Sequence, residues 1–250
     1  MVWEQRWHPL RREWVIVSSY RNERPWQGER VREPARGESG ASLPAYDPDC
    51  YLCPGNARSS GTRNDRYGGV FVFENDHPCV GPAAPAALAP PTGLYRNSPA
   101  QGSARVVCYT PRHDLTLAQL PGPEILALLR VLQAQYRELG KRDEVRHVLV
   151  FENKGEVVGV SNPHPHCQIY ATNFVFKTIE LEAETQAAYL SEHGRTLFGD
   201  IVAAAEADGR RLLVRRGQAL SFVPYFARYP YETYVAPRAT RASLADLTEP

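Results

Sequence analysis

The segment "SNPHPHCQIY", residues 161–170, holds two histidines between prolines and places a glutamine two residues after the second histidine. Proline fixes its own φ angle and pushes the preceding residue toward extended backbone. The two prolines therefore predict an extended segment. Because side chains alternate between the two faces of such a segment, we expect His164, His166 and Gln168 to lie along one face.

A row of two imidazoles and an amide suits the binding of a phosphate group. Neutral imidazole is a nucleophile near pH 7, and an amide N–H can donate to a phosphoryl oxygen. A histidine that attacks phosphorus needs a lone pair on one ring nitrogen, so the other nitrogen is expected to donate its proton to a carbonyl. The alternative is a rigid edge strand whose histidines face solvent, because proline lacks the donor that a central strand requires.

The segment "DPDCYLCPGN", residues 47–56, has the C-x-x-C spacing of a zinc knuckle. Turn signals flank Cys50 and Cys53 on both sides, which favours zinc over a redox dithiol at a strand-to-helix junction or two unpaired thiols. One such pair leaves two ligands to be found elsewhere. The candidates are His113, one member of the His-Pro-His pair and, more weakly, His77 and His147.

Weaker indications of a site come from three other stretches. Arg21 and Arg24 in "YRNERPWQG" could clamp a phosphate, although an exposed basic loop fits equally well. Asn75 and Asp76 end a predicted strand, where they could hold a ribose or a base edge or could form a plain turn. The residues that lead to the histidine pair include Asn153, Gly159 and Ser161.

Composition limits the classes of partner. The 29 basic and 28 acidic residues leave a formal charge of +1, which predicts neither nucleic-acid binding nor attraction to anionic membranes. The sequence has no apolar run of the ~20 residues that a membrane-spanning helix needs. The first residues lack a signal-peptide core, and five cysteines do not make a disulfide scaffold, so we expect a cytoplasmic protein.

Hydrophobic periodicity predicts a mixed α+β chain. A helix is expected over 121–140, with Pro123 in its first turn and Gly140 just after its end. Residues 179–208 are expected to be mostly helical. Strands are expected over 12–19, 68–76, 104–110, 145–153, 159–172, 211–216, 218–225 and 231–237.

Two stretches also resemble each other within the chain. "VVCYTPRHDLTLAQLPGPE" and "ETYVAPRATRASLADLTEP" share a strand, a Pro-Arg step, a Leu-x-x-Leu pair and an acidic, proline-containing helix start. Duplication explains this pattern better than coincidence. The second copy stops at Pro250, so we expect a folding unit that is incomplete or is completed by another chain.

Six motifs occur in an order that covers nearly the whole chain: "RNERPWQG", "DPDCYLCPGN", "VFEND", "TPRHDLTL", "FENKG" and "GVSNPHPHCQIYA". Together they resemble the galactose-1-phosphate uridylyltransferase family of the histidine-triad superfamily. The resemblance implies an α+β, histidine-triad-like fold in which helices pack on an antiparallel sheet, with one complete repeat and an incomplete second repeat. The expected halves are 1–178, with the zinc knuckle and catalytic strand, and 179–250, with linking helices and the start of the second half.

The resemblance also implies an activity, the transfer of uridylyl from UDP-glucose to galactose 1-phosphate in galactose metabolism. His166 is then the nucleophile, Gln168 holds the uridylyl phosphate, and the protein is a homodimer in which Arg21 and Arg24 reach across the interface. The implied zinc ligands are Cys50, Cys53, His113 and His164. The implied substrate contacts are Asn75, Asp76, Asn153, Gly159, Val160 and Ser161.

Departures from the family leave some alternatives open. Val160 stands where the family often has cysteine, and family members continue beyond the equivalent of Pro250. Glu182 aligns with one ligand of a second metal site in the family, but a lone carboxylate is a poor site, so its role stays open. The alternatives are a nucleotide hydrolase or phosphorylase, an inactive half that needs a C-terminal partner chain, and a zinc-stabilised binding module.

Overall fold

The computed structural model describes residues 3–18, 43–85, 88–89, 92–155, 158, 160 and 162–248. The chain divides into two compact units, one formed by residues 30–175 and the other by residues 1–29 and 176–250. Four residues expected at the site lie outside the described part: Arg21, Arg24, Gly159 and Ser161.

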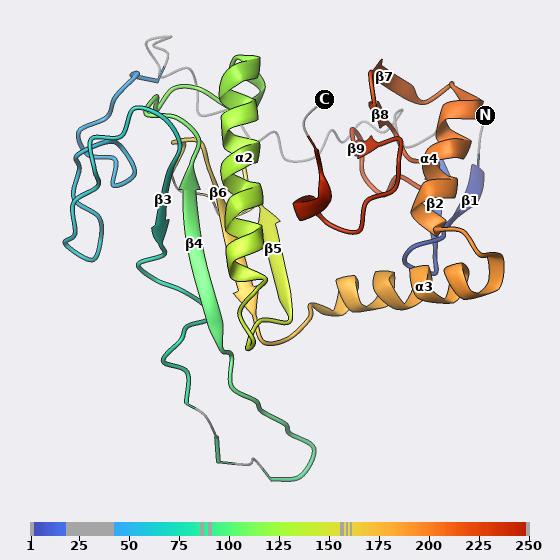
Figure 1. Cartoon of the computed structure of the whole chain (residues 1–250), viewed down its shortest axis with the longest axis horizontal. Helices are drawn as coiled ribbons and strands as arrows, with labels where there is room; N and C mark the ends of the chain where they lie inside the picture. Colours follow the sequence, from blue (N-terminus) through green and yellow to red (C-terminus); the bar gives the residue numbers. More distant parts are fainter. Residues whose placement is uncertain are drawn as a thin grey trace. The chain divides into compact units, whose positions relative to one another are not determined.

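The unit of residues 30–175 is built on a four-stranded antiparallel sheet in the order β3-β4-β6-β5 (Figure 1). The expected strands are present: β3, β5 and β6 are shorter than their sequence patterns, and β4 has the expected length but begins two residues earlier. Their bounds are Phe71–Glu74 for β3, Gly102–Cys108 for β4, His147–Phe151 for β5 and His166–Thr172 for β6.

The expectation of one strand over 159–172 was wrong at its N-terminal end, because β6 begins at His166. The preceding prolines have no N–H to donate to a neighbouring strand, and the N–H of His164 donates to the side-chain oxygen of Asn162 at 3.0 Å. His164 therefore lies before the strand, and its ring is buried. Of the three side chains expected in one row, only those of His166 and Gln168 belong to the strand and share a face.

Register fixes which side chains share that face. His166 pairs with Cys108 and Gln168 pairs with Val106 on the central strand β4. The alternate residues of β6, such as Ile169, are buried on the opposite side. We call the side that carries His166 and Gln168 the open face of the sheet, where both side chains are half-buried, whereas Val106 and Cys108 on the same side are buried in a cluster with the cysteine turn.

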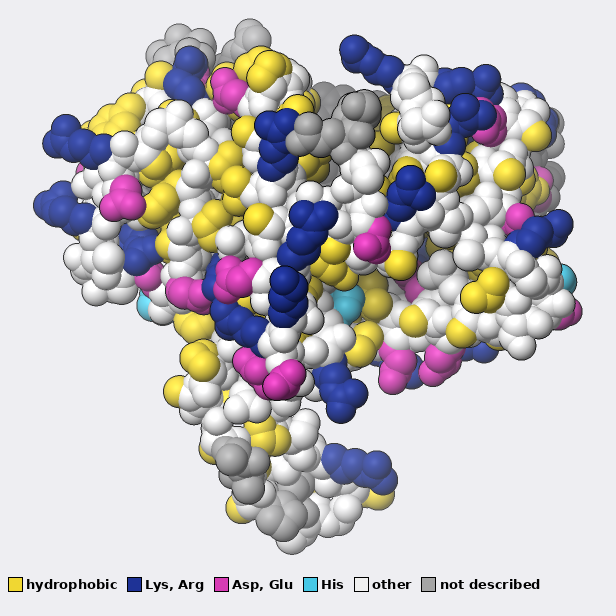
Figure 2. Space-filling view, in the orientation of Figure 1, with side chains coloured by type: hydrophobic (Ala, Val, Ile, Leu, Met, Phe, Trp, Pro, Cys, Tyr) yellow, Lys and Arg dark blue, Asp and Glu magenta, His cyan; other side chains and the backbone are white. Residues whose placement is uncertain are grey.

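Helix α2, Gly122–Leu139, covers the other face, as Figure 1 shows. It begins with proline in the first turn and ends before Gly140, as its pattern predicts. Arg105 of β4 bonds to Glu138 of α2 at 2.7 Å and to Glu74 of β3 at 2.8 Å. Figure 2 shows acidic and basic side chains side by side over this region. A short 3-10 turn, η2 (Leu117–Gln119), precedes the helix.

The second unit contains a β-hairpin, two helices and a small sheet. The hairpin pairs β1, Trp3–His8, with β2, Glu13–Ser18. Of these two strands, only β2 was predicted from the sequence. The sequence of β1 contains charged residues, and it forms a strand by pairing with β2. The other elements are α3 (Lys177–His193), α4 (Leu197–Asp208), β7 (Leu212–Arg216), β8 (Ala219–Phe222), β9 (Tyr234–Pro237) and the 3-10 turn η4 (Leu244–Asp246).

The helical stretch predicted over 179–208 is two helices. Gly194 ends α3 with a φ of +67°, a conformation that glycine adopts without strain. Thr196 then caps α4 by accepting a hydrogen bond from the N–H of Gly199 at 3.3 Å. The sheet β7-β8-β9 is antiparallel, and its inner face forms a core with α4 through Val202, Leu220, Phe222 and Ala236.

The architecture is thus mixed α/β with antiparallel sheets and few helices. The internal repeat stays a prediction. Among the described residues, no helix combines the length and the apolar character that crossing a membrane requires.

Candidate metal centre and active site

The C-x-x-C segment forms a tight turn that aims both thiols inward. The N–H of Cys53 donates to the carbonyl of Cys50 at 3.1 Å, and the N–H of Leu52 donates to the Cys50 sulfur at 3.3 Å. Asn56 and Asn64 donate side-chain amide hydrogens to main-chain carbonyls of the turn. The backbone and these two amides thus fix the turn that carries both sulfur atoms.

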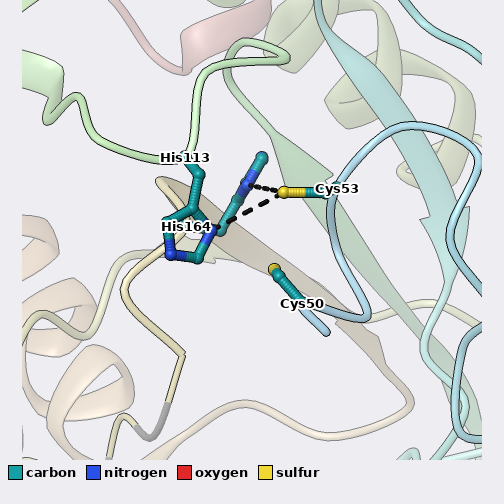
Figure 3. A group of neighbouring side chains, drawn as sticks. All are labelled: Cys50, Cys53, His113 and His164. Atoms are coloured by element: carbon teal, nitrogen blue, oxygen red, sulfur yellow. Dashed lines mark hydrogen bonds between the residues drawn. The ribbon is translucent and has the colours of Figure 1, made fainter. Parts of the chain in front are cut away.

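Four buried side chains converge on one point: Cys50, Cys53, His113 and His164. Their ligand atoms all lie within 4.8 Å of one another. The Cys53 sulfur is 3.6 Å from Nδ1 of His113 and 3.5 Å from Nδ1 of His164 (Figure 3). Two thiols and two imidazoles at this spacing could hold a four-coordinate metal ion. From the open set of histidines, the fold thus selects His113 and His164 for the cluster.

The ring of His164 is held by hydrogen bonds at its other nitrogen. Nε2 lies 3.1 Å from the carbonyl oxygen of Thr110 and 3.0 Å from the hydroxyl of Tyr67. A carbonyl oxygen only accepts, and the Tyr67 hydroxyl donates its hydrogen to the carbonyl of Leu52 at 2.6 Å. Nε2 therefore carries the proton, and the lone pair of Nδ1 faces Cys53. Metal-binding histidines are commonly oriented in this way.

Burial sets the protonation of the cluster. Desolvation, followed by the neighbouring His113, lowers the pKa of His164 to about 4, so its imidazole is neutral at pH 7. Desolvation also raises the pKa of Cys53 to about 11. A metal ion that binds here must displace the thiol proton, and metal affinity therefore falls at acid pH.

Sequence reasoning missed two residues that support the cluster. Asn162 is buried, donates from its amide nitrogen to the Cys50 sulfur at 3.3 Å and accepts from the N–H of His164. Tyr67 bridges Leu52 and His164. The only signal for Asn162 was an asparagine before proline, which is typical of a turn; Tyr67 carried no signal.

His166 lies next to this cluster, at the start of β6. Its Nδ1 atom is 2.8 Å from the carbonyl oxygen of His164. Because that oxygen can only accept, Nδ1 carries a proton, and in the neutral ring the lone pair is on Nε2. The side chain is half-buried on the open face. In the neutral tautomer that this contact selects, the Nε2 atom is the nitrogen with a lone pair for attack.

The side chain of Gln168 lies one step further along the same face. Its Oε1 atom accepts from Nδ2 of Asn75 at 3.2 Å and from the hydroxyl of Tyr170 at 3.3 Å. Asn75 follows β3, and its N–H donates to the carbonyl of Ala104 at 2.8 Å. The fold therefore brings together Asn75 and Gln168, which are far apart in the sequence.

The remaining described candidates are placed differently. Asp76 forms an ion pair with Arg58 at 3.5 Å and accepts from the Ser59 hydroxyl at 3.3 Å, which ties it to the loop after the cysteine turn. Asn153 is exposed just after β5, and Val160 is half-buried with its N–H bonded to the carbonyl of Gly155.

These features define an α/β protein that has antiparallel sheets and a buried Cys2His2 cluster able to hold a metal ion beside a strand histidine. Residues 1–175 match the family model described as galactose-1-phosphate uridyl transferase, N-terminal domain. The chain belongs to the galactose-1-phosphate uridylyltransferase family, whose named members are nucleotidyltransferases.

Curated members from two organisms illustrate the similarity. The galactose-1-phosphate uridylyltransferase of Haemophilus influenzae is 39% identical over 98% of this chain and 68% of its own length. That of Rattus norvegicus is 36% identical over 97% of this chain and 62% of its own length. The chain therefore spans about two thirds of the length of these relatives.

Solved structures agree with the fold. A uridylyltransferase structure aligns with 98% of this chain and 69% of its own length, at a TM-score of 0.71 and 29% identity. An ADP-glucose phosphorylase from Arabidopsis thaliana, solved with bound ADP-glucose, aligns with 99% of this chain and 72% of its own length, at a TM-score of 0.72 and 21% identity. The second likeness concerns the fold alone.

Proposed function

We propose that this chain transfers uridylyl from UDP-glucose to galactose 1-phosphate through a covalent uridylyl-histidine on Nε2 of His166. The observation that carries the proposal is the 2.8 Å contact between Nδ1 of His166 and the carbonyl oxygen of His164, which fixes the proton on Nδ1. Membership in the galactose-1-phosphate uridylyltransferase family supports the choice of substrates.

The reaction consists of two displacements at one phosphorus atom. The Nε2 lone pair attacks the α-phosphorus, a P–N bond forms, and the P–O bond to the β-phosphate breaks, so that glucose 1-phosphate leaves with the electron pair. A phosphate oxygen of galactose 1-phosphate then attacks the same phosphorus. The P–N bond breaks, UDP-galactose leaves, and His166 is again neutral with its proton on Nδ1.

Gln168 is proposed to hold the uridylyl phosphate. Its Oε1 atom is occupied by Asn75 and Tyr170, so its Nε2 hydrogens are the groups left to donate. An amide donor placed beforehand stabilises the charge that grows on the phosphoryl oxygens during transfer. The other proposed substrate contacts, as the family resemblance implies, are Arg21, Arg24, Asn75, Asp76, Asn153, Gly159, Val160 and Ser161.

We further propose that the Cys2His2 cluster binds zinc. A tetrahedral zinc ion with Zn–S near 2.3 Å and Zn–N near 2.1 Å sets neighbouring sulfur and nitrogen ligands about 3.6 Å apart. The measured separations of 3.6 and 3.5 Å fit this geometry. Bound zinc would cross-link the cysteine turn, the His113 loop and the segment that leads to His166. Its role is structural.

The finer description of the fold and the assembly is also a proposal. We infer histidine-triad-like halves over 1–178 and 179–250, the second of them an incomplete repeat, and a homodimer in which Arg21 and Arg24 act across the interface. A cytoplasmic location stays a prediction from the sequence. Family resemblance supports the two halves and the homodimer.

The test uses UDP-glucose labelled with ³²P in either phosphate. The α label should remain on the folded, zinc-loaded protein as an acid-labile adduct, and the β label should leave with glucose 1-phosphate. His166→Gln should abolish labelling, whereas His193→Gln, at the exposed end of α3, serves as the control. Absence of α label on the folded protein refutes the proposal.

The acceptor is identified by a chase of the labelled protein. Galactose 1-phosphate should release the label as UDP-galactose. Release by water or inorganic phosphate alone would instead indicate a hydrolase or a phosphorylase. Label that appears only after a second polypeptide is added would identify the chain as one half of an active unit.

A further inference from the structure

We propose that Tyr170 is a positioning residue, whose hydroxyl acts with the amide of Asn75 to hold the N–H groups of Gln168 toward the reacting phosphate. The inference rests on the proposed function and deepens it, because it adds a residue that acts through Gln168. Tyr170 follows His166 and Gln168 at alternate positions of β6, so all three side chains lie on the open face.

The orientation of the Gln168 amide follows from a chain of hydrogen bonds that starts at the backbone. The N–H of His77 donates to Oδ1 of Asn75 at 2.9 Å. A backbone N–H can only donate, so this contact identifies the oxygen of Asn75 and places its Nδ2 at the other end. Nδ2 lies 3.2 Å from Gln168. An amide nitrogen needs an acceptor, so Oε1 of Gln168 must face Asn75.

Tyr170 supplies the second bond to the same oxygen, at 3.3 Å. A carbonyl oxygen has two lone pairs, and both now have a donor. Burial, with the neighbouring Cys79 thiol, raises the pKa of Tyr170 to about 12, so the hydroxyl is protonated and able to donate at neutral pH. The ring is fixed by an edge contact with Phe151, with 4.8 Å between the ring centroids.

This arrangement has a direct effect on phosphoryl transfer. With Oε1 held by two donors, Nε2 is the part of the amide that remains to meet a phosphate on the open face. A reversed amide would present oxygen lone pairs to an anionic phosphate and would repel it. Negative charge on the phosphoryl oxygens grows in the transition state. A correctly held donor therefore increases the rate of transfer more than it increases the affinity for substrate.

The variant Tyr170→Phe keeps the ring against Phe151 and removes only the hydroxyl. One lost hydrogen bond of ordinary strength corresponds to a roughly three- to tenfold decrease in the single-turnover rate of uridylylation. KM for UDP-glucose should change by less than about twofold, because the contact acts on the transition state. Tyr189→Phe is the matched control, since the Tyr189 hydroxyl donates to Asp200 at 2.7 Å in the other unit.

A double-mutant cycle separates positioning from a general structural effect. In a Gln168→Ala protein, Tyr170→Phe should cause no further loss of rate, because the group on which the hydroxyl acts is gone. An equal loss in both backgrounds would overturn the proposal. So would an unchanged rate for Tyr170→Phe in the wild-type background.

A second readout does not need activity. The side-chain ¹⁵N–¹H₂ signals of Gln168 can be assigned by their disappearance in Gln168→Ala. They should shift in Tyr170→Phe and stay in place in Tyr189→Phe. Unmoved signals would overturn the positioning role even in an active protein. If the signals shift but UDP-glucose leaves no label on the wild-type chain, the hydrogen bond is established and the proposed function fails.

Discussion

The Nδ1 atom of His166 lies 2.8 Å from the carbonyl oxygen of His164, whose own ring enters the Cys2His2 cluster. One residue therefore orients the proposed nucleophile with its main chain and contributes to the Cys2His2 cluster with its side chain. The segment that joins them contains a proline and no regular secondary structure. A metal ion bound to the cluster would therefore hold His164 and, through the carbonyl oxygen of His164, the ring of His166.

Metal removal should therefore weaken both the fold and the reaction. We expect a chelator to lower the free energy of unfolding by at least about 3 kcal/mol, because binding to a site that forms only in the folded chain adds to stability. Thermal unfolding before and after zinc is restored measures this change. The His166→Gln variant should lose as much thermal stability on metal removal as the wild type, because His166 is outside the cluster. Equal melting temperatures with and without metal would contradict the prediction.

Tyr67 should tune metal affinity without touching the ion. Tyr67→Phe removes the hydroxyl that accepts from Nε2 of His164 and donates to Leu52. Loss of such an orienting contact commonly weakens metal binding about 10- to 100-fold. Competition with a chromophoric chelator gives the affinity, and Tyr189→Phe is the control. A Tyr67→Phe protein that binds zinc as tightly as the wild type would show that Thr110 alone orients the ring.

The pairing of β4 and β6 should depend on Gly102. A Cβ atom at this position would lie 2.0 Å from the carbonyl oxygen of Ala171 on β6. The three nearest atoms all belong to the backbone of β6, so no flexible side chain can move away, and we expect Gly102→Ala to lower the unfolding free energy by about 2–4 kcal/mol. Urea titration measures the loss. Gly69→Ala is the control, because a Cβ there meets nothing within 4 Å. Equal urea midpoints for Gly102→Ala and Gly69→Ala would show that β4 and β6 accommodate a Cβ at residue 102 without loss of stability.

Local pattern accounts for much of what the sequence could predict. Apolar spacing predicted helix α2 and the strands that follow it, and the C-x-x-C pair together with several candidate histidines predicted the cluster, from which the fold selects His113 and His164. Strand β1 was missed because its charged residues become a strand only by pairing with β2. Similarly, strand periodicity predicted that His164 belongs to the strand. The prolines prevent the ladder of backbone hydrogen bonds from reaching back to His164, and β6 begins at His166.

The supporting contacts could not be predicted because they join distant parts of the chain. Tyr67 and His164 are 97 residues apart, and Asn162 reaches Cys50 across 112 residues. No periodicity encodes such contacts, which exist only after the cysteine turn packs on the sheet. The sequence also did not predict the ion pair that Asp76, a residue implied as a substrate contact, forms with Arg58.

The ion pair between Glu138 and Arg105 should give stability a specific pH dependence. The hydrogen bond from Arg105 lowers the pKa of the Glu138 carboxyl to about 2, against 4.5 without these contacts. A carboxyl whose pKa is lower in the folded state stabilises the fold above the unfolded pKa and loses that contribution as pH falls toward the folded pKa. The contribution should be complete near pH 6 and should decline between about pH 4.5 and 2. Because Glu138 is half-exposed, its size should stay below about 1 kcal/mol.

Glu138→Gln tests this prediction by urea unfolding at pH 6 and pH 3. The wild type should be the more stable protein at pH 6, and the difference should shrink at pH 3. Both proteins share the same metal cluster, so its own acid sensitivity cancels in the comparison. Glu180→Gln, which removes an exposed ion pair with Lys177 on α3, is the control. A difference that is equal at the two pH values, or larger at pH 3, would show that Arg105 does not stabilise the charged form of Glu138.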